Sequence, residues 1–244
     1  MIEAIRSVNR ASILDLLYKI KEAAVVSEKE GCRRNLPAMN NSRIRTRIFL
    51  LSPANASGVN GQGLLGASGE SDLALRLRRS GAPLGEVYRF ISRLYFRGKL
   101  DYAEKFQNPP HGIAGVQIIT GAGLMLPETV VTLSDLRRIS STAIDAENSH
   151  YRRPLDSDLL RLREAVRDET DIILLGSLAT SKYITPIAEV FRERLLFPRD
   201  FLGRGDMSRG SMLLRCCTQG LELEYLPVET IKRSARKSAS VQGG

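Results

Sequence analysis

The chain has 244 residues, 43% hydrophobic and 26% charged, the usual balance for a globular protein of one large domain or a domain with an appended segment. Its net charge of +9 lies in the two ends, because residues 46–229 carry 23 basic and 22 acidic side chains, which argues against a nucleic-acid-binding surface spread over the body. The sequence has no apolar run of the ~18 residues that a membrane-spanning helix needs and no secretory signal pattern, so we expect a cytoplasmic protein without a membrane partner. Its three cysteines and two histidines do not have the spacing of a metal site, so we expect no metal and no cofactor.

Residues 1–42 are predicted to be an N-terminal helix and linker. Apolar side chains at helical spacing between residues 12 and 24 make one amphipathic helix, and the polar stretch 27–42 suits a linker. At the other end, residues 230–244 carry four basic side chains and no acidic one, which predicts a basic disordered tail. Such ends can add weak contact with nucleic acid. The remaining residues, 43–229, form the predicted α/β domain.

The first strand of this domain is predicted at 48–51, where four apolar residues stand together. Such a run suits a strand buried on both faces, as in a parallel sheet covered by helices. A loop of small polar residues and glycines follows, up to residue 63, and α/β proteins place ligands at exits of this kind. The residues selected here are Ser52, Ser57 and Gly58 as ligand contacts and Asn55 as a catalytic candidate.

Two helical regions are predicted next, at 71–80 and at 84–106, the second kinked near Gly98. Aromatic and basic side chains alternate within the second region. That mixture suits base stacking with phosphate contact, or a helix with a buried aromatic face and a charged outer face. Tyr95 and Arg97 are selected as ligand contacts and Asp101 as a catalytic candidate.

The second and third strands are predicted at 116–119 and 172–175, and each also ends in small residues, at 120–123 and 176–183. Between them we expect a helix at 132–140 that begins with a capping box, then a polar stretch at 141–153 and a helix at 155–167. The ligand candidates at these two exits are Gly121, Gly123, Ser177 and Lys182.

The last third of the chain predicts a helix up to about residue 195, an irregular loop at 197–210, a helix at 211–218 and an edge strand at 221–226. Glycines and arginines just ahead of a helix make an anion cradle, which the helix dipole assists, although a helix cap explains the same residues equally well. Arg204 and Arg209 are selected as ligand contacts and Asp206 as a catalytic candidate.

This alternation of strands and helices predicts a three-layer α/β sandwich with a mostly parallel central sheet of about four strands. Right-handed crossovers would bring the three strand exits to one edge of the sheet. None of the exits matches a known nucleotide motif: there is no GxGxxG, and the glycines at 61–63 lack the ending of a P-loop. Glycine and serine are also what any tight turn after a strand requires.

Three stretches together resemble a small, mostly uncharacterised family of bacterial and phage α/β domains. They are the early strand ending in serine, the segment Leu94-Tyr95-Phe96-Arg97-Gly98-Lys99 to Tyr102-Ala103, and the strand with its turn, Ile118-Ile119-Thr120-Gly121-Ala122-Gly123-Leu124-Met125-Leu126-Pro127.

The family shows a Leu-Tyr…Phe-Arg-Lys…Tyr-Ala helix and a Ser-Ala-x-x-Gly-Leu-x-x-Pro turn at these places, and the likeness covers residues 47–217. It departs where the family has Lys or His before Gly-Leu, since Ala122 and Gly123 stand there. The family is distantly similar to the central domain of archaeosine synthase, whose fold is like that of uracil-DNA glycosylases. The resemblance therefore implies nucleobase or nucleotide chemistry.

Two functions follow as hypotheses. In the first, the protein binds a nucleotide or modified nucleobase at the strand exits, with base transfer or N-glycosidic cleavage as the reaction if there is one. In the second, it is a non-catalytic accessory protein that binds a protein partner or nucleic acid through its termini. The sequence alone does not decide whether the protein is an enzyme.

Overall fold

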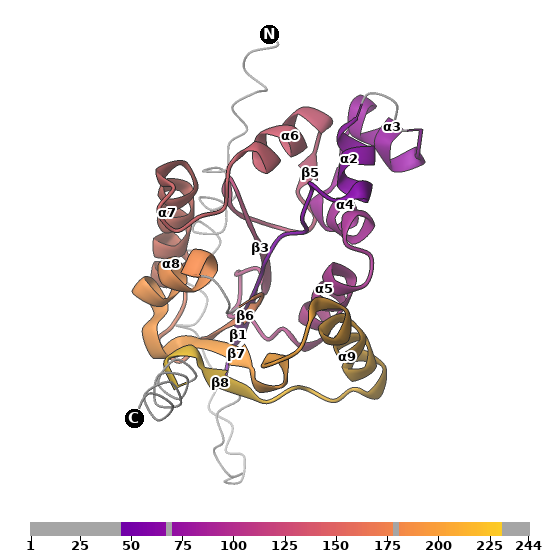
Figure 1. Cartoon of the computed structure of the whole chain (residues 1–244). Helices are drawn as coiled ribbons and strands as arrows, with labels where there is room; N and C mark the ends of the chain where they lie inside the picture. Colours follow the sequence, from indigo (N-terminus) through magenta and orange to yellow (C-terminus); the bar gives the residue numbers. More distant parts are fainter. Residues whose placement is uncertain (1–44, 67–69, 178–180, 231–244) are drawn as a thin grey trace, which may run out of the picture.

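The computed structural model describes residues 45–66, 70–177 and 181–230 (Figure 1). The predicted N-terminal helix and linker, 1–42, and the basic tail from residue 231 onward lie outside these ranges. Within the described ranges, no helix is both long enough and apolar enough to cross a membrane.

The main sheet has six strands in the order β4-β3-β1-β6-β7-β8. Its inner strands are parallel and its two edge strands are antiparallel to their neighbours. The predicted α/β class and mostly parallel sheet are confirmed, but the sheet has six strands instead of about four. The additional strands lie where a turn and the end of a helix are predicted. The strands are β1 (Arg47–Leu51), β3 (Val116–Thr120), β4 (Gly123–Met125), β6 (Asp171–Leu175), β7 (Leu195–Pro198) and β8 (Tyr225–Pro227).

Strand β1 is the centre of the sheet and of the hydrophobic core. It pairs with β3 on one side and with β6 on the other, in a register that sets Ile48 beside Ile172 and Leu51 beside Leu175. Every side chain from Ile48 to Leu51 is fully buried. All four residues of the run are apolar because successive side chains of a strand point to opposite faces of the sheet, and helices cover both faces.

The helices form a layer on each face of the sheet (Figure 1). One layer consists of α7 and α8, and the other contains α4, α5 and α9. A small antiparallel pair, β2 (Ala82–Pro83) and β5 (Val130–Val131), lies apart from the main sheet. The helices are α2 (Val59–Leu65), α3 (Asp72–Arg79), α4 (Leu84–Ile91), α5 (Tyr95–Phe106), α6 (Leu133–Ser141), α7 (Ser149–Ala165), α8 (Ser181–Phe191) and α9 (Asp206–Gln219), with 3-10 turns η1 (Arg192–Arg194) and η2 (Arg199–Phe201).

Side-chain caps determine where α3, α6 and α7 begin; at α3 the Ser71 hydroxyl accepts from the amide of Ala74. The predicted capping box at the start of α6 is confirmed: Thr132 accepts from the amide of Asp135, whose carboxylate accepts from the amide of Thr132. Helix α7 begins at Ser149, inside the stretch predicted to be irregular, because the Asn148 side chain accepts from the amide of the second helical residue.

The predicted helix at 84–106 is in fact two helices, and the break lies at residues 92–94 instead of at Gly98. Gly98 sits inside α5, where α9 crosses it. A Cβ atom at Gly98 would lie 2.8 Å from the Gly210 carbonyl oxygen, and one at Gly210 would lie 2.9 Å from the Tyr95 Cα. Gly210 is therefore a helix-crossing residue in α9, which begins at Asp206, five residues earlier than predicted.

Candidate functional site

The exits of β1 and β6 meet at the carboxyl edge of the sheet. The amide of Ser52 donates a 3.1 Å hydrogen bond to the Leu175 carbonyl. Gly176 packs directly against Ser52, because a Cβ atom added there would lie 3.2 Å from the Ser52 Cβ. Two of the three predicted exits therefore converge, as parallel pairing of their strands requires.

The exit of β3 differs from the prediction, because residues 120–123 form a tight hairpin instead of an open ligand loop. Thr120 pairs with Gly123, and the Thr120 hydroxyl donates to the Gly123 carbonyl at 2.8 Å. Gly123 has a φ of 98°, a conformation that glycine adopts without strain. Its role is therefore the turn. Gly121 does reach the site, since it lines the larger of the two cavities described next.

Two adjoining cavities lie at these exits and share a wall. The first has a volume of about 490 Å³ and extends toward α6, and the second has about 370 Å³ and extends toward α5 and α9. The shared wall consists of Pro53, Ala54, Asn55, Lys182 and Tyr183. Pockets of this size accept small organic ligands.

Lys99 is the most unusual group in the second cavity. Its side chain comes from α5 and is only 1% exposed. Its Nζ donates to the Ser52 carbonyl at 2.5 Å and to the Ser52 hydroxyl at 2.8 Å. No carboxylate lies within ion-pair distance of it among the residues that the structure describes. Lys99 thus ties α5 to the end of β1 without a counter-ion.

Burial lowers the pKa of Lys99 from its usual 10.5 to about 7. The negative charge of Asp206 opposes this fall, and the positive charge of Arg209 adds to it. A lysine in such surroundings exists as amine and ammonium in comparable amounts near neutral pH. It can serve as a base, an acid or a nucleophile, which an ordinary surface lysine does poorly.

Three tyrosines contribute to the cavity walls. Tyr95 and Tyr183 line the second cavity, and Tyr88 and Tyr183 line the first. The Tyr95 hydroxyl oxygen is buried and has no hydrogen-bond partner of normal geometry among the residues that the structure describes. Burial raises the pKa of Tyr95 to about 12, although the nearby guanidinium of Arg209 lowers it in part. The phenol therefore stays protonated and is available as a donor.

The start of α9 brings charge to the mouth of the second cavity. Asp206 lines that cavity, with 68% of its side chain exposed, and pairs with Arg209 at 3.6 Å. Arg209 does not line either cavity: its guanidinium donates twice to the Phe201 carbonyl, at 3.0 and 3.2 Å. Its contribution is to hold α9 and orient Asp206.

The loop after β1 supplies polar groups to both cavities. Asn55 lies in the shared wall, and its side-chain oxygen accepts from the amide and the hydroxyl of Ser57 at 3.1 and 2.7 Å. Ser57 lines the first cavity, and Gly58 lines the second, where it precedes α2. Within the described part of the chain, the Asn55 amide nitrogen has no protein partner.

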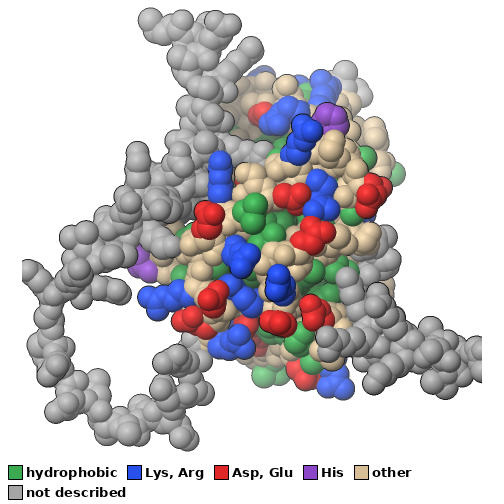
Figure 2. Space-filling model, turned by 90° about the vertical axis from the view of Figure 1, so that its left-hand side faces the viewer, with side chains coloured by type: hydrophobic (Ala, Val, Ile, Leu, Met, Phe, Trp, Pro, Cys, Tyr) green, Lys and Arg blue, Asp and Glu red, His purple; other side chains and the backbone are tan. Residues whose placement is uncertain are grey.

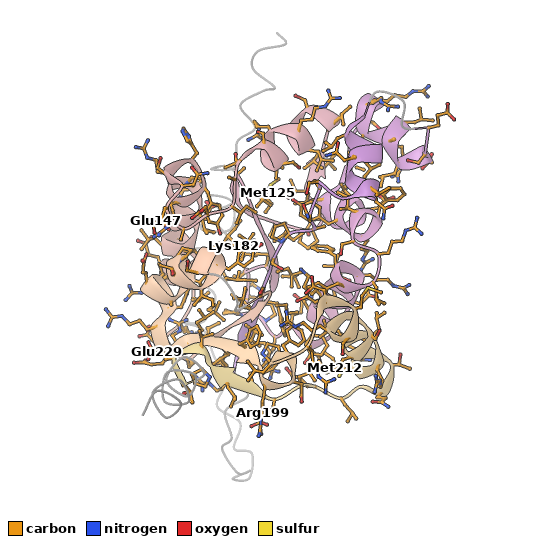
Figure 3. All side chains as sticks on the ribbon, in the orientation of Figure 1. Met125, Glu147, Lys182, Arg199, Met212 and Glu229 are labelled. Atoms are coloured by element: carbon orange, nitrogen blue, oxygen red, sulfur yellow. The ribbon has the colours of Figure 1, made fainter. Side chains whose placement is uncertain are left out.

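Lys182 is the cation shared by both cavities. It is half-buried at the start of α8 (Figure 3), and its Nζ lies 5.1 Å from the centroid of the Tyr183 ring. The Tyr151 hydroxyl donates to its backbone carbonyl at 2.9 Å, which fixes the chain at this position. No carboxylate of the described ranges pairs with Lys182. Ser177, from the exit of β6, also lines the second cavity.

Besides Gly123 and Arg209, three more predicted site residues lie outside both cavities. The side chain of Arg97 is 63% exposed and forms an ion pair with Asp101 on the outer surface. The Asp101 carboxylate forms a second ion pair, with the guanidinium of Arg89 at 2.6 Å. Arg204 is exposed in the turn before α9. The aromatic and basic side chains of α5 are therefore divided between two faces. Tyr95 and Arg97 are two residues apart and so lie on opposite sides of the helix, with Tyr95 facing the site and Arg97 facing away from it.

Three residues that line the cavities are not among the predicted site residues: Lys99, Tyr88 and Tyr183. A signal for Lys99 exists: it follows Tyr95 by four residues and so lies on the apolar stripe of α5, where a lysine is out of place. Burial of a polar residue on an apolar stripe is a better indicator of a site than a cluster of exposed charges.

The described residues contain no group of three or more His, Cys, Asp or Glu side chains arranged to hold a metal ion. Comparison of the chain with protein-family models, with curated proteins and with solved structures gives no match. The resemblance to the bacterial and phage α/β family stays a prediction.

Proposed function

We propose that the protein binds a nucleotide or a modified nucleobase in the two adjoining cavities at the carboxyl edge of the sheet. The observation that carries this proposal is the shared wall, where Lys182, which no carboxylate of the described residues pairs with, lies together with the Asn55 amide and the Tyr183 ring. A base needs an aromatic surface and hydrogen-bond partners for its edge, and a phosphate needs a cation.

The distribution of groups supports one orientation of the ligand. The Tyr95 and Tyr183 rings offer stacking surfaces in the second cavity, and the amide of Asn55 can both donate and accept. Lys182 reaches either cavity and would neutralise a phosphate. The two volumes together suit a ligand with two parts, one aromatic and one anionic.

If the protein is an enzyme, N-glycosidic cleavage or base transfer is the reaction that this site supports. The transition state of glycoside cleavage carries positive charge on the sugar, which a carboxylate stabilises. Asp206 is the carboxylate of the second cavity. Asn55 would orient the base. Asp101 has no part in this reaction, since its ion pairs hold it outside the cavities.

Calorimetric titration with nucleotides, free nucleobases and short DNA tests the proposal. Lys182→Ala should weaken nucleotide binding by roughly 10-fold or more, since a hydrogen bond to a charged group contributes about 1.5–3 kcal/mol. The matched control is Lys105→Ala, which removes an exposed lysine of α5. The proposal fails if no compound binds, or if Asn55→Ala and Lys182→Ala both bind as tightly as the unaltered chain.

Salt dependence separates this function from binding through the termini. The face over α7 and α8 carries basic and acidic side chains interspersed (Figure 2), and Arg152 pairs there with Asp156 and Glu189. Nucleic-acid binding through basic ends should fall steeply with added salt, and deletion of residues 1–38 or 230–244 should abolish it. Binding in the cavities should respond weakly to salt and survive both deletions.

A further inference from the structure

Lys99 is a buried cation that the binding proposal leaves unused. A charged group buried without a counter-ion is costly, and proteins usually pair it or neutralise it. Lys99 is 1% exposed, lines the second cavity and has no carboxylate partner among the described residues. A merely structural contact with Ser52 would be made at lower cost by a neutral donor.

The number of hydrogen-bond acceptors around Nζ of Lys99 favours the neutral amine. An amine has two N–H donors and one lone pair, whereas an ammonium has three donors. The Ser52 carbonyl and hydroxyl, at 2.5 and 2.8 Å, satisfy both donors of an amine and leave its lone pair free. The third proton of an ammonium has the rings of Tyr95 and Phe96 near it, with centroids 4.6 and 5.0 Å from Nζ.

A second observation in the same cavity points to a ligand. The Tyr95 hydroxyl oxygen is buried, and among the described residues it makes no hydrogen bond of normal geometry, with the Arg209 guanidinium as its nearby polar neighbour. Buried hydroxyls are nearly always satisfied. A ligand oxygen in the cavity would accept from the Tyr95 hydroxyl. Lys99 and Tyr95 both line the cavity, and Nζ of Lys99 lies 4.6 Å from the centroid of the Tyr95 ring. A nucleophile and a hydrogen-bond donor are the two groups that attack on a carbonyl requires.

We propose that Lys99 forms an imine with an aldehyde bound in the second cavity, specifically the open-chain form of a sugar phosphate. The inference rests on the proposed function, because cleavage of an N-glycosidic bond exposes the aldehyde of the sugar. Lys182, in the shared wall, holds the phosphate.

The steps balance without an oxidant or a reductant. The Nζ lone pair attacks the carbonyl carbon while the C=O π pair moves to oxygen, which the Tyr95 hydroxyl stabilises by donation. One Nζ proton passes to that oxygen and gives a carbinolamine. The C–O bond then breaks, the second Nζ proton leaves with the hydroxyl as water, and a C=N bond remains.

The lowered pKa of about 7 makes this attack efficient at neutral pH. About half of the Lys99 side chains are then neutral, against roughly one in 3,000 for a lysine at its ordinary pKa. Formation of the imine should rise with pH up to about 8 and level off above it.

Reductive trapping on the full chain tests the inference. The probe is 2-deoxyribose 5-phosphate with cyanoborohydride, and peptide mass mapping locates the reduced adduct on the unaltered protein. We expect Lys99 to carry most of the label at pH 7, at least 10-fold more than Lys105, with Lys105→Met leaving the adduct unchanged. Lys99→Met should abolish it, and Tyr95→Phe, which keeps the ring and Lys99, should slow it.

An adduct spread over exposed lysines, with Lys99 no faster than Lys105, would overturn the inference. So would labelling of Lys99 that rises only above pH 9. Nucleotide titration without reductant separates the two proposals. Nucleotide binding without a Lys99 adduct refutes the imine alone, and a Lys99 adduct without nucleotide or nucleobase binding refutes the proposed ligand and leaves the imine standing.

Discussion

Replacement of Lys99 by methionine changes how the stability of the protein depends on pH. The folded protein lowers the pKa of Lys99 from 10.5 to about 7, so between these values the unfolded chain holds a proton that the folded chain lacks. The free energy of unfolding therefore rises with pH across this window, by about 1.4 kcal/mol per pH unit and up to about 5 kcal/mol in total. Below pH 7 both states are protonated and the slope vanishes.

Urea unfolding measured from pH 6 to pH 10 provides the assay. Other groups also hold different numbers of protons in the folded and unfolded states; burial raises the pKa of the Cys216 and Cys217 thiols, for example. They are present in both proteins, so the difference in free energy between the unaltered chain and Lys99→Met isolates Lys99. Methionine keeps the length and the packing of the side chain but leaves the Ser52 acceptors unsatisfied, which offsets the whole curve by a constant.

The expected result is a difference that grows with pH above 7 in favour of the unaltered chain. A difference that stays constant from pH 6 to pH 10 refutes the reasoning, because it means that Lys99 keeps its ordinary pKa when folded. A difference that shrinks as pH rises would mean that an unseen anion stabilises the ammonium, and the account of an uncompensated buried lysine would then be wrong.

Asp206→Asn removes the charge that raises the pKa of Lys99, so the midpoint of its titration, followed by competitive labelling, should move to lower pH; an unchanged or higher midpoint contradicts the electrostatic link. Gly98→Ala places a methyl group 2.8 Å from a backbone carbonyl of α9 and should cost about 1–3 kcal/mol, or roughly 2–4 °C of melting temperature per kcal/mol. Gly63→Ala, in a helix with open space around it, is the matched control and should be neutral or stabilising. Thr132→Ala breaks the capping box of α6 and should cost about 1 kcal/mol in urea unfolding, whereas an unchanged midpoint would show that the cap is redundant.

Local patterns were sufficient to predict most of the parallel sheet. The apolar runs at 48–51 and 172–175 predict buried strands, and they lie within β1 and β6 respectively. The capping box at Thr132 marks the start of α6 correctly because a cap involves only neighbours in the chain. Strand β7 is not predicted because its apolar run, Leu195 to Phe197, is only three residues long and follows an apolar helix closely, so periodicity does not separate the two.

The candidate site was predictable only in part. Asn55, Ser177 and Lys182 line the cavities because they follow parallel strands, whose ends meet at one edge. Gly123 lies in a hairpin turn and outside both cavities, because the chain reverses there and a hairpin and a ligand loop use the same small residues. Asp101 lies outside the cavities because its face of α5 points outward, and the inward face of a helix depends on what packs against it.

The sequence by itself determined that apolar strands alternate with helices and that small residues follow the strands, since these features depend on neighbours in the chain. Only the tertiary structure decided that the Lys99 side chain is buried away from water. That burial requires β1 to present Ser52, α5 to be turned inward, and α9 to approach it closely at Gly98 and Gly210. The pKa of a lysine reflects everything packed around it, and those contacts come from segments about 50 and about 110 residues away in the chain.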